Sequence, residues 1–329
     1  ESGFRKLPMP KARKLVSLYQ AFGAKVSGGK WYIGGQYLQT YFSPYKMTDV
    51  TDGSIVELPV ENVVDMAGGR GYRTWGLVYR TSDNVSKILN ASINSYGAIG
   101  YQSGEGSLTT KPVFMLHHGF GDGIAFIEYD DSYVYQGEAR PYHFLGWNMN
   151  NGTSAGIYSA KAIKSIIKHG YSDVYYLNVE GELWFKKSGA SAAQATQLAA
   201  ECGVIREIFH FPAGGSQNAN TMNGSILIQT VDGKLYAKGT NGAYQMGLPE
   251  AKTYTDFEEV PGNYGRVKCF ESGLMLTEDG KLYHTGNAIT NITGKHTGGG
   301  FSQIFPELKF KDMAYDQSGQ TLVVLLDEE

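Results

Sequence analysis

Five residues that recur along this chain constrain its fold more than any other feature. Residues 232–236 read Asp-Gly-Lys-Leu-Tyr, and residues 279–283 repeat them without change. Weaker copies occupy residues 27–32, 131–135 and 180–184. A tight turn followed by alternating apolar and polar positions is typical of a β-hairpin. Each copy therefore predicts a hairpin with a two-residue turn.

The predicted turns recur at a nearly constant spacing. They fall at Gly29, Asn84, Ser132, Gly181, Gly233 and Gly280. Successive turns are therefore 55, 48, 49, 52 and 47 residues apart. A unit repeated at about 50 residues forms an array or a propeller, because one unit alone cannot bury its apolar face. Although a chain of 329 residues suggests about two domains by length, the repetition predicts one domain over residues 1–329 with about seven repeats.

The residues around the turns resemble a known repeat family. An apolar strand precedes Asp-Gly-Lys-Leu-Tyr, and a Gly, an Asn and a Gly-containing close follow it. This order resembles the regulator-of-chromosome-condensation repeat, which forms seven-bladed β-propellers. Residues 200–295 match well, and the second and third repeats match less closely. The first and fourth match weakly, and in the fourth the Ala-rich residues 190–200 replace the usual close.

The two ends of the chain predict how such a ring would close. Residues 311–315 and 321–326 look like the opening strands of a last repeat. Residues 1–7 resemble a strand that follows a turn. One blade shared by both termini would leave no long free edge. The predicted fold is therefore an all-β, seven-bladed β-propeller with termini that share one blade.

One aromatic position recurs directly after the turns. We expect these residues to pack between blades, because they occupy one equivalent strand position. They are Tyr32, Tyr135, Trp184, Tyr236 and Tyr283.

Charge and cysteine content exclude several classes of function. The formal net charge of −3 and the pI near 6.2 argue against nucleic acid as a partner, because phosphate binding needs a basic surface. The basic cluster at residues 11–14 is short, and we interpret it as a solvated strand edge. No apolar run approaches the roughly 18 residues that cross a bilayer, so no transmembrane segment is expected. Cys202 and Cys269 are too few for a disulfide framework, and we expect free, partly buried thiols, although one bridge between repeats stays open.

No motif predicts catalysis. His117, His118 and Asp122 form the only dense cluster of metal-ligand residue types. Neighbouring residues of a strand point to opposite faces, so the two histidines are poorly placed to share a metal. The glycine-rich stretches at 68–71 and 119–123 lack the dinucleotide-binding spacing, and no Gly-x-Ser-x-Gly occurs. We therefore expect no catalytic residue, no metal and no cofactor.

The resemblance implies a rigid body that binds other macromolecules. Nucleotide exchange on a small GTPase, with attachment to chromatin, normally comes with a basic extension that this sequence lacks. Ultraviolet sensing in the plant photoreceptor depends on clustered tryptophans, but the four here are spread among the repeats. Bacterial relatives that inhibit secreted enzymes present aromatic loops from one rim of the propeller. That use requires only a composition like this one, rich in Tyr, Gly and Asn.

The sequence thus favours a non-enzymatic recognition propeller that binds a protein or a cell-surface glycan through rim loops. We expect it outside the cell or on a virus particle, of bacterial or phage origin, as a receptor-binding or host-recognition protein or an inhibitor of a secreted enzyme. The candidate contacts are aromatic and His residues near the end of each repeat, although each could instead pack on its own blade. They are Tyr37, Tyr41, Tyr96, Tyr101, Tyr142, His143, Trp147 and Tyr244. The alternative is a carbohydrate-binding or carbohydrate-active propeller enzyme, in which such rings stack on sugars.

Overall fold

The structure is a computed structural model, and the fold rests on the residues that it describes. These are residues 4–18, 21–35, 54–69, 74–80, 82–83, 86–92, 104–109, 113–117, 125–129, 134–135, 137–139, 141–146, 157–169, 173–186, 195–210, 225–271, 273–316 and 321–327. Within them, antiparallel strands form six four-stranded sheets, the two-stranded sheet β27–β28 and the small hairpin β11–β12.

Consecutive strands build each sheet, in the order in which they occur along the chain. The first two sheets contain β1 (Ala12–Leu18), β2 (Ala21–Val26), β3 (Trp31–Gly35) and β4 (Ile55–Glu57), then β5 (Val63–Gly69), β6 (Thr74–Arg80), β7 (Ser86–Ser92) and β8 (Gly104–Thr109). The third contains β9 (Val113–His117), β10 (Ala125–Tyr129), β13 (Tyr142–Gly146) and β14 (Ile157–Ser159), with β11 (Val134–Tyr135) and β12 (Glu138–Ala139) inserted. The fourth contains β15 (Ile163–His169), β16 (Asp173–Asn178), β17 (Leu183–Lys186) and β18 (Thr196–Leu198).

The remaining sheets continue the same order. The fifth contains β19 (Ile205–His210), β20 (Ile226–Thr230), β21 (Leu235–Thr240) and β22 (Thr253–Glu259). The sixth contains β23 (Val267–Glu271), β24 (Leu274–Thr277), β25 (Leu282–His284) and β26 (Ser302–Ile304), and it is followed by β27 (Phe310–Asp316) and β28 (Thr321–Leu326). Two short helical segments, η3 (Ala200–Cys202) and α2 (Thr290–Thr293), accompany them. No described helix is long and apolar enough to span a membrane.

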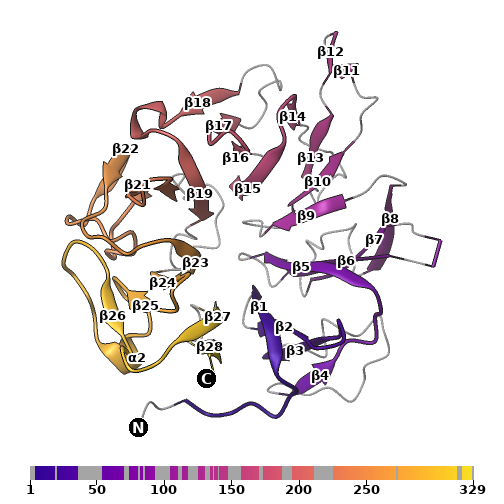
Figure 1. Cartoon of the computed structure of the whole chain (residues 1–329), viewed down its shortest axis with the longest axis horizontal. Helices are drawn as coiled ribbons and strands as arrows, with labels where there is room; N and C mark the ends of the chain where they lie inside the picture. The colour runs from indigo at the N-terminus through magenta and orange to yellow at the C-terminus, as the bar shows by residue number, and fades with distance from the viewer. Residues whose placement is uncertain are drawn as a thin grey trace.

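The sheets stand around a common axis. Figure 1 shows the first strand of each sheet nearest the centre and the later strands progressively further out. The first strands follow one another around this centre, from β1 through β5, β9, β15, β19 and β23 to β27. This arrangement is a β-propeller, so the predicted all-β propeller fold is confirmed.

The apolar core lies between neighbouring sheets. One cluster joins Trp31 and Ile33 of the first sheet to Met66 and Leu77 of the second. Others join the fourth sheet to the fifth and the sixth to β27. The residue before the recurring aromatic is at most 2% exposed in four sheets, at Trp31, Leu183, Leu235 and Leu282. The repeated phrase therefore places one fully buried side chain in each of these four inter-sheet clusters.

The recurring aromatic residue joins the inter-sheet packing at Tyr283, but at Trp184 it packs within the fourth sheet. Tyr283 lies edge-on to Tyr264, with ring centroids 5.3 Å apart. Trp184 stacks on Tyr176 of the neighbouring strand at 6.4 Å. Tyr135 does not share this position, because it lies in the hairpin β11–β12.

The repeated turns are one residue longer than predicted. In the fifth sheet, the N–H of Gly233 donates to the carbonyl of Thr230 (3.0 Å), and the N–H of Thr230 donates to the carbonyl of Lys234 (3.0 Å). This pattern defines a three-residue loop whose last residue is left-handed, and Gly233 has φ 92°. The prediction of a two-residue turn was therefore wrong. The side chain of Thr230 also donates to Asp232 and to the carbonyl of Lys234, which stabilises this longer loop.

The turn glycines connect neighbouring sheets. The carbonyl of Gly181 accepts from the N–H of Ile205 at the start of β19, and that of Gly280 accepts from Phe310 at the start of β27, both at 3.0 Å. At the equivalent place in the fifth sheet, Gln229 bridges the carbonyl of Gly233 (3.2 Å) and the N–H of Val267 (2.9 Å). The turns of the fourth, fifth and sixth sheets therefore help to position the first strand of the next sheet.

The third repeat differs from its prediction. Strand β10 pairs with β13, from Ala125 opposite Gly146 to Tyr129 opposite Tyr142. Residues 134–135 are therefore not the outgoing strand of this sheet. The predicted turn at Ser132 lies outside the described residues, and the inserted hairpin has Gly137, with φ 84°, between its two strands. The predicted turn at Asn84 lies outside the described residues.

Side-chain hydrogen bonds join the last sheet to the first. The N–H of Leu15 in β1 donates to Oδ2 of Asp312 in β27 (2.8 Å). The N–H of Tyr315 donates to Oγ of Ser17 (3.0 Å). These bonds close the ring between β27 and β1.

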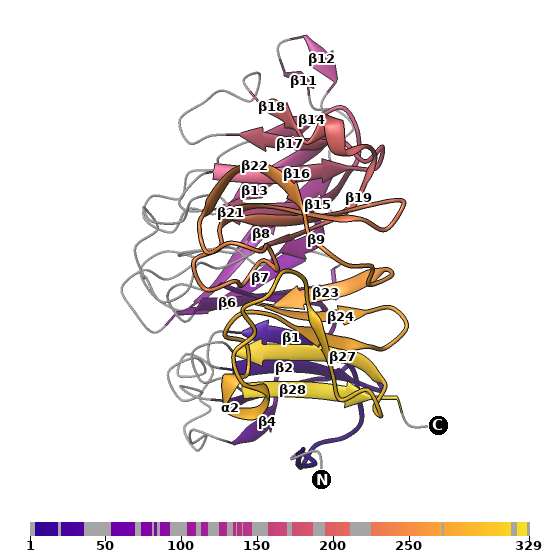
Figure 2. The ribbon, with the colours of Figure 1, turned by 90° about the vertical axis from the view of Figure 1, so that its left-hand side faces the viewer.

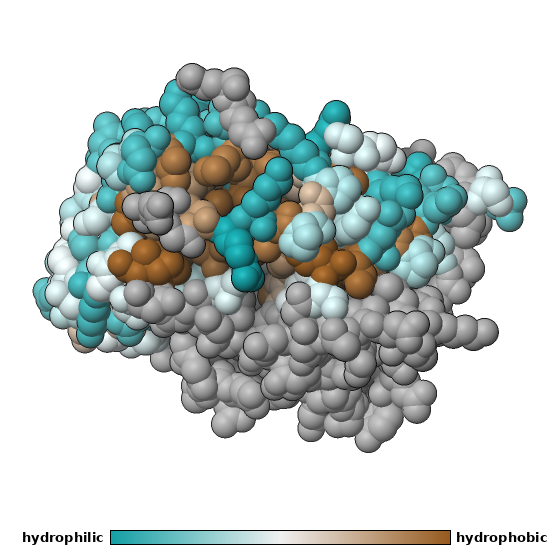
Figure 3. Space-filling view, turned by 90° about the horizontal axis from the view of Figure 1, so that it is seen from below, coloured by the Kyte–Doolittle hydropathy of each residue, from teal (hydrophilic) through white to brown (hydrophobic). Residues whose placement is uncertain are grey.

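The N-terminal segment approaches the last sheet without pairing to it. Phe4 lies 5.1 Å from Phe305 and 6.2 Å from Phe310, measured between ring centroids. Among the described residues, no strand precedes Ala12, and β28 pairs only with β27. Residues 322–326 of β28 are all half-buried apolar side chains. Seen from this side of the ring, apolar surface lies on both sides of a narrow hydrophilic band (Figure 3).

The connecting role of the turn glycines leads to a stability prediction. A Cβ at Gly181 would lie 2.8 Å from the carbonyl oxygen of Ile205, whereas a Cβ at Gly233 would meet nothing within 4 Å. Both residues have positive φ, at 81° and 92°. We expect Gly233→Ala to lower the free energy of unfolding by about 1 kcal/mol through backbone strain alone. Gly181→Ala should cost at least about 2 kcal/mol more, because the next sheet must move.

Denaturant unfolding of both variants measures this difference. Equal losses of stability in the two variants would show that the turn does not position the next sheet.

Candidate functional site

Two long loops form the described part of the predicted binding rim. Residues 241–252 connect β21 to β22, and residues 285–301 connect β25 to β26. Both leave the ends of strands opposite the repeated turns, and Figure 2 shows α2, which belongs to the second loop, at one face of the ring. We call these two segments the rim-loop pair. The N–H of Gly300 donates to the carbonyl of Gly247 (2.6 Å), so the loops of two neighbouring sheets are joined directly.

Asn241 organises the first loop from within. Its side chain is fully buried, and Nδ2 donates to the carbonyls of Leu248 and Glu250, each at 2.8 Å. Its Oδ1 accepts from the N–H of Met246 (3.0 Å). A buried amide with three satisfied hydrogen bonds holds this stretch of irregular backbone in one shape.

Tyr244 stands at the bend of this loop. Its backbone is left-handed, with φ 58°, which is uncommon for a residue other than glycine. Its carbonyl accepts from the N–H of Gly247 (3.1 Å) and from Oγ1 of Thr285 in the second loop (3.0 Å). The half-buried ring has the ammonium of Lys295 6.0 Å from its centroid. The site therefore presents a rigid aromatic ring beside a positive charge on a long side chain.

Two histidines meet at the second loop: His284 ends β25, and His296 lies within the loop. The rings of His284 and His296 meet edge-to-face, with centroids 5.6 Å apart. Nδ1 of His284 lies 3.2 Å from Oγ1 of Thr293, and Nδ1 of His296 lies 3.4 Å from Oγ1 of Thr285. Burial lowers the pKa of His284, and the neighbouring His296 lowers it further. The buried histidine is therefore held neutral at physiological pH.

The structure places only some of the predicted contact residues. Tyr142 and His143 lie in β13, opposite Tyr129 and Glu128, so they belong to a strand and not to a rim loop. Tyr244 lies in the rim-loop pair. The others fall outside the described residues: Tyr37, Tyr41, Tyr96, Tyr101 and Trp147. Of the possible catalytic cluster, His118 and Asp122 are outside them too, and His117 ends β9.

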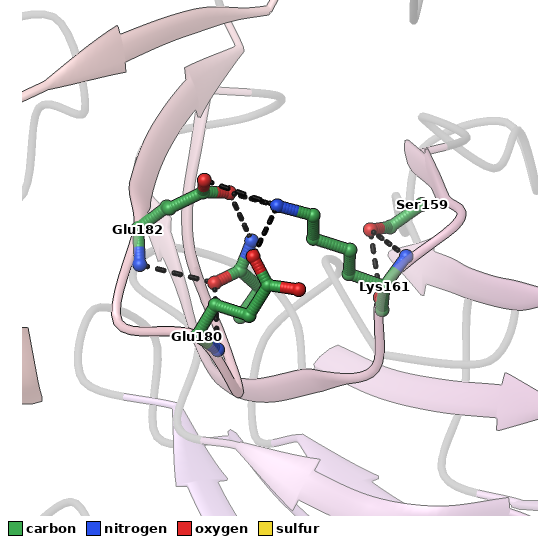
Figure 4. Close-up of polar contacts among 5 residues, drawn as sticks. Ser159, Lys161, Glu180 and Glu182 are labelled. Atoms are coloured by element: carbon green, nitrogen blue, oxygen red, sulfur yellow. Dashed lines mark hydrogen bonds and ion pairs between the residues drawn. The ribbon is translucent and has the colours of Figure 1, made fainter.

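One pair of carboxylates resembles the arrangement that a hydrolase would need. Glu180 and Glu182 flank the turn between β16 and β17, and both contact Nζ of Lys161 (Figure 4). Asn178 also donates to Glu182 (2.6 Å). Lys161, and then Asn178, hold the pKa of Glu182 below its usual range, so it is poorly suited to donate a proton. Within the described residues this cluster is a satisfied ion-pair network.

The other reactive groups are also explained by their surroundings. Burial raises the pKa of Asp312, opposed chiefly by the N–H of Leu15 that donates to it. Cys202 and Cys269 are free thiols, as expected. Burial raises the pKa of Cys202 to about 11, which disfavours the nucleophilic thiolate. No group of three or more His, Cys, Asp or Glu among the residues that the structure covers could hold a metal ion.

One recurring position was missed from the sequence. The second residue of every first strand is bulged out of its ladder, and in five of these strands it is basic. The five are Arg13, Lys164, Arg206, Lys268 and Lys311. The signal is apolar–basic–variable–apolar, for example Ile163-Lys164-Ser165-Ile166, at the start of most repeats. An alignment of the repeats on their turns does not reveal this position, because the number of residues between each turn and the first strand of the next sheet varies.

Comparisons with known proteins identify the fold. No protein-family model matches the sequence, and no curated protein matches it. Among solved structures, Prp20p from Saccharomyces cerevisiae, also named yeast RCC1, has a TM-score of 0.62 at 12% identity, over 92% of this chain and 80% of that one. Human WBSCR16 has a TM-score of 0.61 at 15% identity, over 94% and 85%. The propeller domain of Myceliophteria thermophila Cps50 (Swd1) has 0.51 at 10%, over 97% and 93%. At these identities the likeness shows a shared β-propeller fold.

The buried amide of Asn241 generates a prediction about the rim. Asn241→Ala leaves two carbonyls and one N–H without their partner inside the loop. We expect a loss of about 2–4 kcal/mol in the free energy of unfolding and faster hydrogen exchange at Met246. Gln245→Ala, which removes a half-exposed amide from the same loop, should cost about 1 kcal/mol. Unchanged exchange at Met246 in Asn241→Ala would contradict this role.

The buried histidine predicts a dependence on pH. Because the pKa of His284 is lowered in the folded state, the unfolded chain binds its proton more readily. Its contribution to stability is therefore complete above about pH 6.5 and is lost as pH falls below that value, by up to about 1.4 kcal/mol per pH unit. The melting temperature of His284→Gln should fall less than that of the unmodified chain between about pH 7.5 and 5.5. Parallel curves for the two proteins would refute the assignment.

Proposed function

We propose that this propeller is a non-enzymatic recognition protein whose rim loops bind a macromolecular partner. The observation that carries the proposal is the rim-loop pair, in which Tyr244 is held by hydrogen bonds from two sheets beside Lys295. A rigid aromatic ring loses little entropy on binding, and its amphipathic edge suits a protein surface. The other predicted aromatic residues, from Tyr37 to Trp147, remain candidates for the same rim.

Known propellers of this fold make a protein partner plausible on chemical grounds. Prp20p is described as binding Gsp1p and histones, and a crystal structure of yeast RCC1 contains Kap60 bound to it. A propeller binds through loops that its rigid sheets support, so such a use needs no catalytic group. For this chain we propose only the same way of binding, through loops. The partner is a protein, and a cell-surface glycan is the alternative.

The proposal includes a place of action. Low charge together with many Tyr, Asn and Gly residues suits a surface exposed to varied partners outside the cell or on a virus particle. Host recognition by a bacterial or phage protein, or inhibition of a secreted enzyme, are the uses that fit this composition.

We further propose that the chain forms one domain of seven blades, with the termini sharing the last one. The bulge at the second residue recurs in all first strands from β1 to β27, which supports one repeat per first strand. The apolar strand β28 has a free edge within the described residues, and Phe4 lies nearby. A strand from residues 1–7 would cover that edge.

A ligand selection tests the recognition proposal while the partner is unidentified. Peptides displayed on phage are selected on the immobilised protein, and glycans are screened on an array. We expect the ligands to lose at least about tenfold in affinity for Tyr244→Asn, which keeps the left-handed backbone accessible, and for Lys295→Ala.

Matched controls lie at the opposite face of the ring. Tyr32→Ala and Lys234→Ala remove the same residue types beside the repeated turns, where each side chain contacts a glutamate. They should leave binding within about twofold. If no selected peptide or glycan is weakened by the rim substitutions, the rim proposal fails.

Hydrogen exchange tests the shared blade. If residues 1–7 pair with β28, about half of the β28 amides are protected by that strand, and deletion of residues 1–7 exposes them. Protection in β27 should change much less, because β27 keeps its bonds to β28. Identical exchange in β28 before and after deletion would exclude the pairing.

A further inference from the structure

A β-bulge recurs at one position near the axis of the ring. In β15 the ladder to β16 passes from Ile163 to Ser165, and in β23 the ladder to β24 passes from Val267 to Cys269. The residue between them is left unpaired, so its side chain is aimed away from the regular pleat. The same irregularity occurs in the other first strands, at Arg13, Val64, Phe114, Arg206 and Lys311.

Four of the basic residues at this position follow one another over neighbouring sheets through hydrogen bonds, and Arg13 occupies the same position of β1. Nζ of Lys164 donates to the carbonyl of Arg206, and Nη1 of Arg206 donates to the carbonyl of Val267 (3.0 Å). Nζ of Lys268 then donates to the carbonyl of Lys311. We call Arg13, Lys164, Arg206, Lys268 and Lys311 the cation arc.

Three members of the cation arc have no carboxylate in direct contact within the described part of the chain. Arg206 pairs with Glu278, and Lys311 pairs with Asp327. Arg13, Lys164 and Lys268 are exposed and have no ion pair with a carboxylate among the described residues, where their polar contacts are to Ser27 or to carbonyls.

Acidic residues on this face already have other partners, and Glu207, next to Arg206, accepts from Oγ of Ser165. Glu180 and Glu182 are held by Lys161, and Asp279 is held by Lys281. The half-buried carboxylate of Asp312 accepts from the N–H groups of Leu15 and Met313, and the charge of Lys268 opposes the rise of its pKa. The nearby acids therefore leave the arc available to carboxylates from another molecule.

We propose that the cation arc binds an acidic segment of a partner protein, on the face opposite the rim-loop pair. The pairs with Glu278 and Asp327 show that cations at this position accept peptide carboxylates as partners. Val64, at the equivalent position of β5, is 40% exposed, so an apolar residue among the acids would find an apolar contact. A net charge of −3 opposes an extended nucleic-acid backbone more strongly than a short acidic peptide, which carries fewer charges.

Fluorescence anisotropy with a labelled peptide of alternating glutamate and leucine tests this assignment. We expect saturable binding that weakens when salt is raised from about 50 to about 300 mM. Lys164→Gln with Lys268→Gln should reduce affinity at least about tenfold. The matched control, Lys234→Gln with Lys281→Gln, removes the same charge from the same face, but from lysines already paired with carboxylates. It should reduce affinity less than about threefold.

A footprint gives a second readout that does not require the variants to fold. Acetylation of the unmodified protein should be slowed by the peptide at Lys164 and Lys268, and not at Lys234 or Lys281. Equal losses in the two double variants, no saturable binding, or no protection at Lys164 and Lys268 would overturn the proposal. Tighter binding of a DNA oligonucleotide of equal charge would overturn the choice of a protein partner.

Discussion

The hydrogen bonds between the first strand of one sheet and its neighbours hold this ring together. At the bulges of β15 and β19, two successive side chains bond to the adjoining sheets. The first of them reaches a backbone carbonyl of the next sheet, as Lys164 does at Arg206. The second also bonds across, as Asp312 does to the N–H of Leu15 and Lys14 does to Asp65. The apolar clusters between sheets can form only when these strands are in register.

The two faces of the propeller have different chemistry because they use different connections. The three-residue turns on one face leave few backbone N–H and C=O groups without a hydrogen-bond partner. Their charged side chains pair with nearby acids, as Lys234 does with Glu259. Long loops on the other face need buried side chains such as Asn241 to satisfy their backbone. Shape can therefore vary at the rim loops without disturbing the sheets. The turn face offers instead a regular pattern of charge around the axis.

Much of the fold followed from the sequence, but less of the candidate site did. The turn spacing and the buried residue before each aromatic predicted the repeat and its packing, because both depend on near neighbours. The prediction that Tyr135 lies in the outgoing strand of the third repeat was wrong, since an inserted hairpin carries this residue. Tyr142 and His143 were expected in a rim loop, but because of this inserted hairpin they lie in strand β13. The basic bulge position was missed, because a bulge depends on how two strands pair and not on the residue alone.

The sequence by itself determined a repeated hairpin unit and, through its period, an all-β propeller. Turn glycines and alternating apolar residues determine structure over a few neighbouring residues, so they can be recognised in the sequence. Only the tertiary structure decided which repeats touch and through which atoms. Tyr244 meets Thr285 across 41 residues, and Leu15 meets Asp312 across 297. Such contacts arise when rigid sheets are brought side by side around an axis, which is why the rim-loop pair and the cation arc became visible only in the folded molecule.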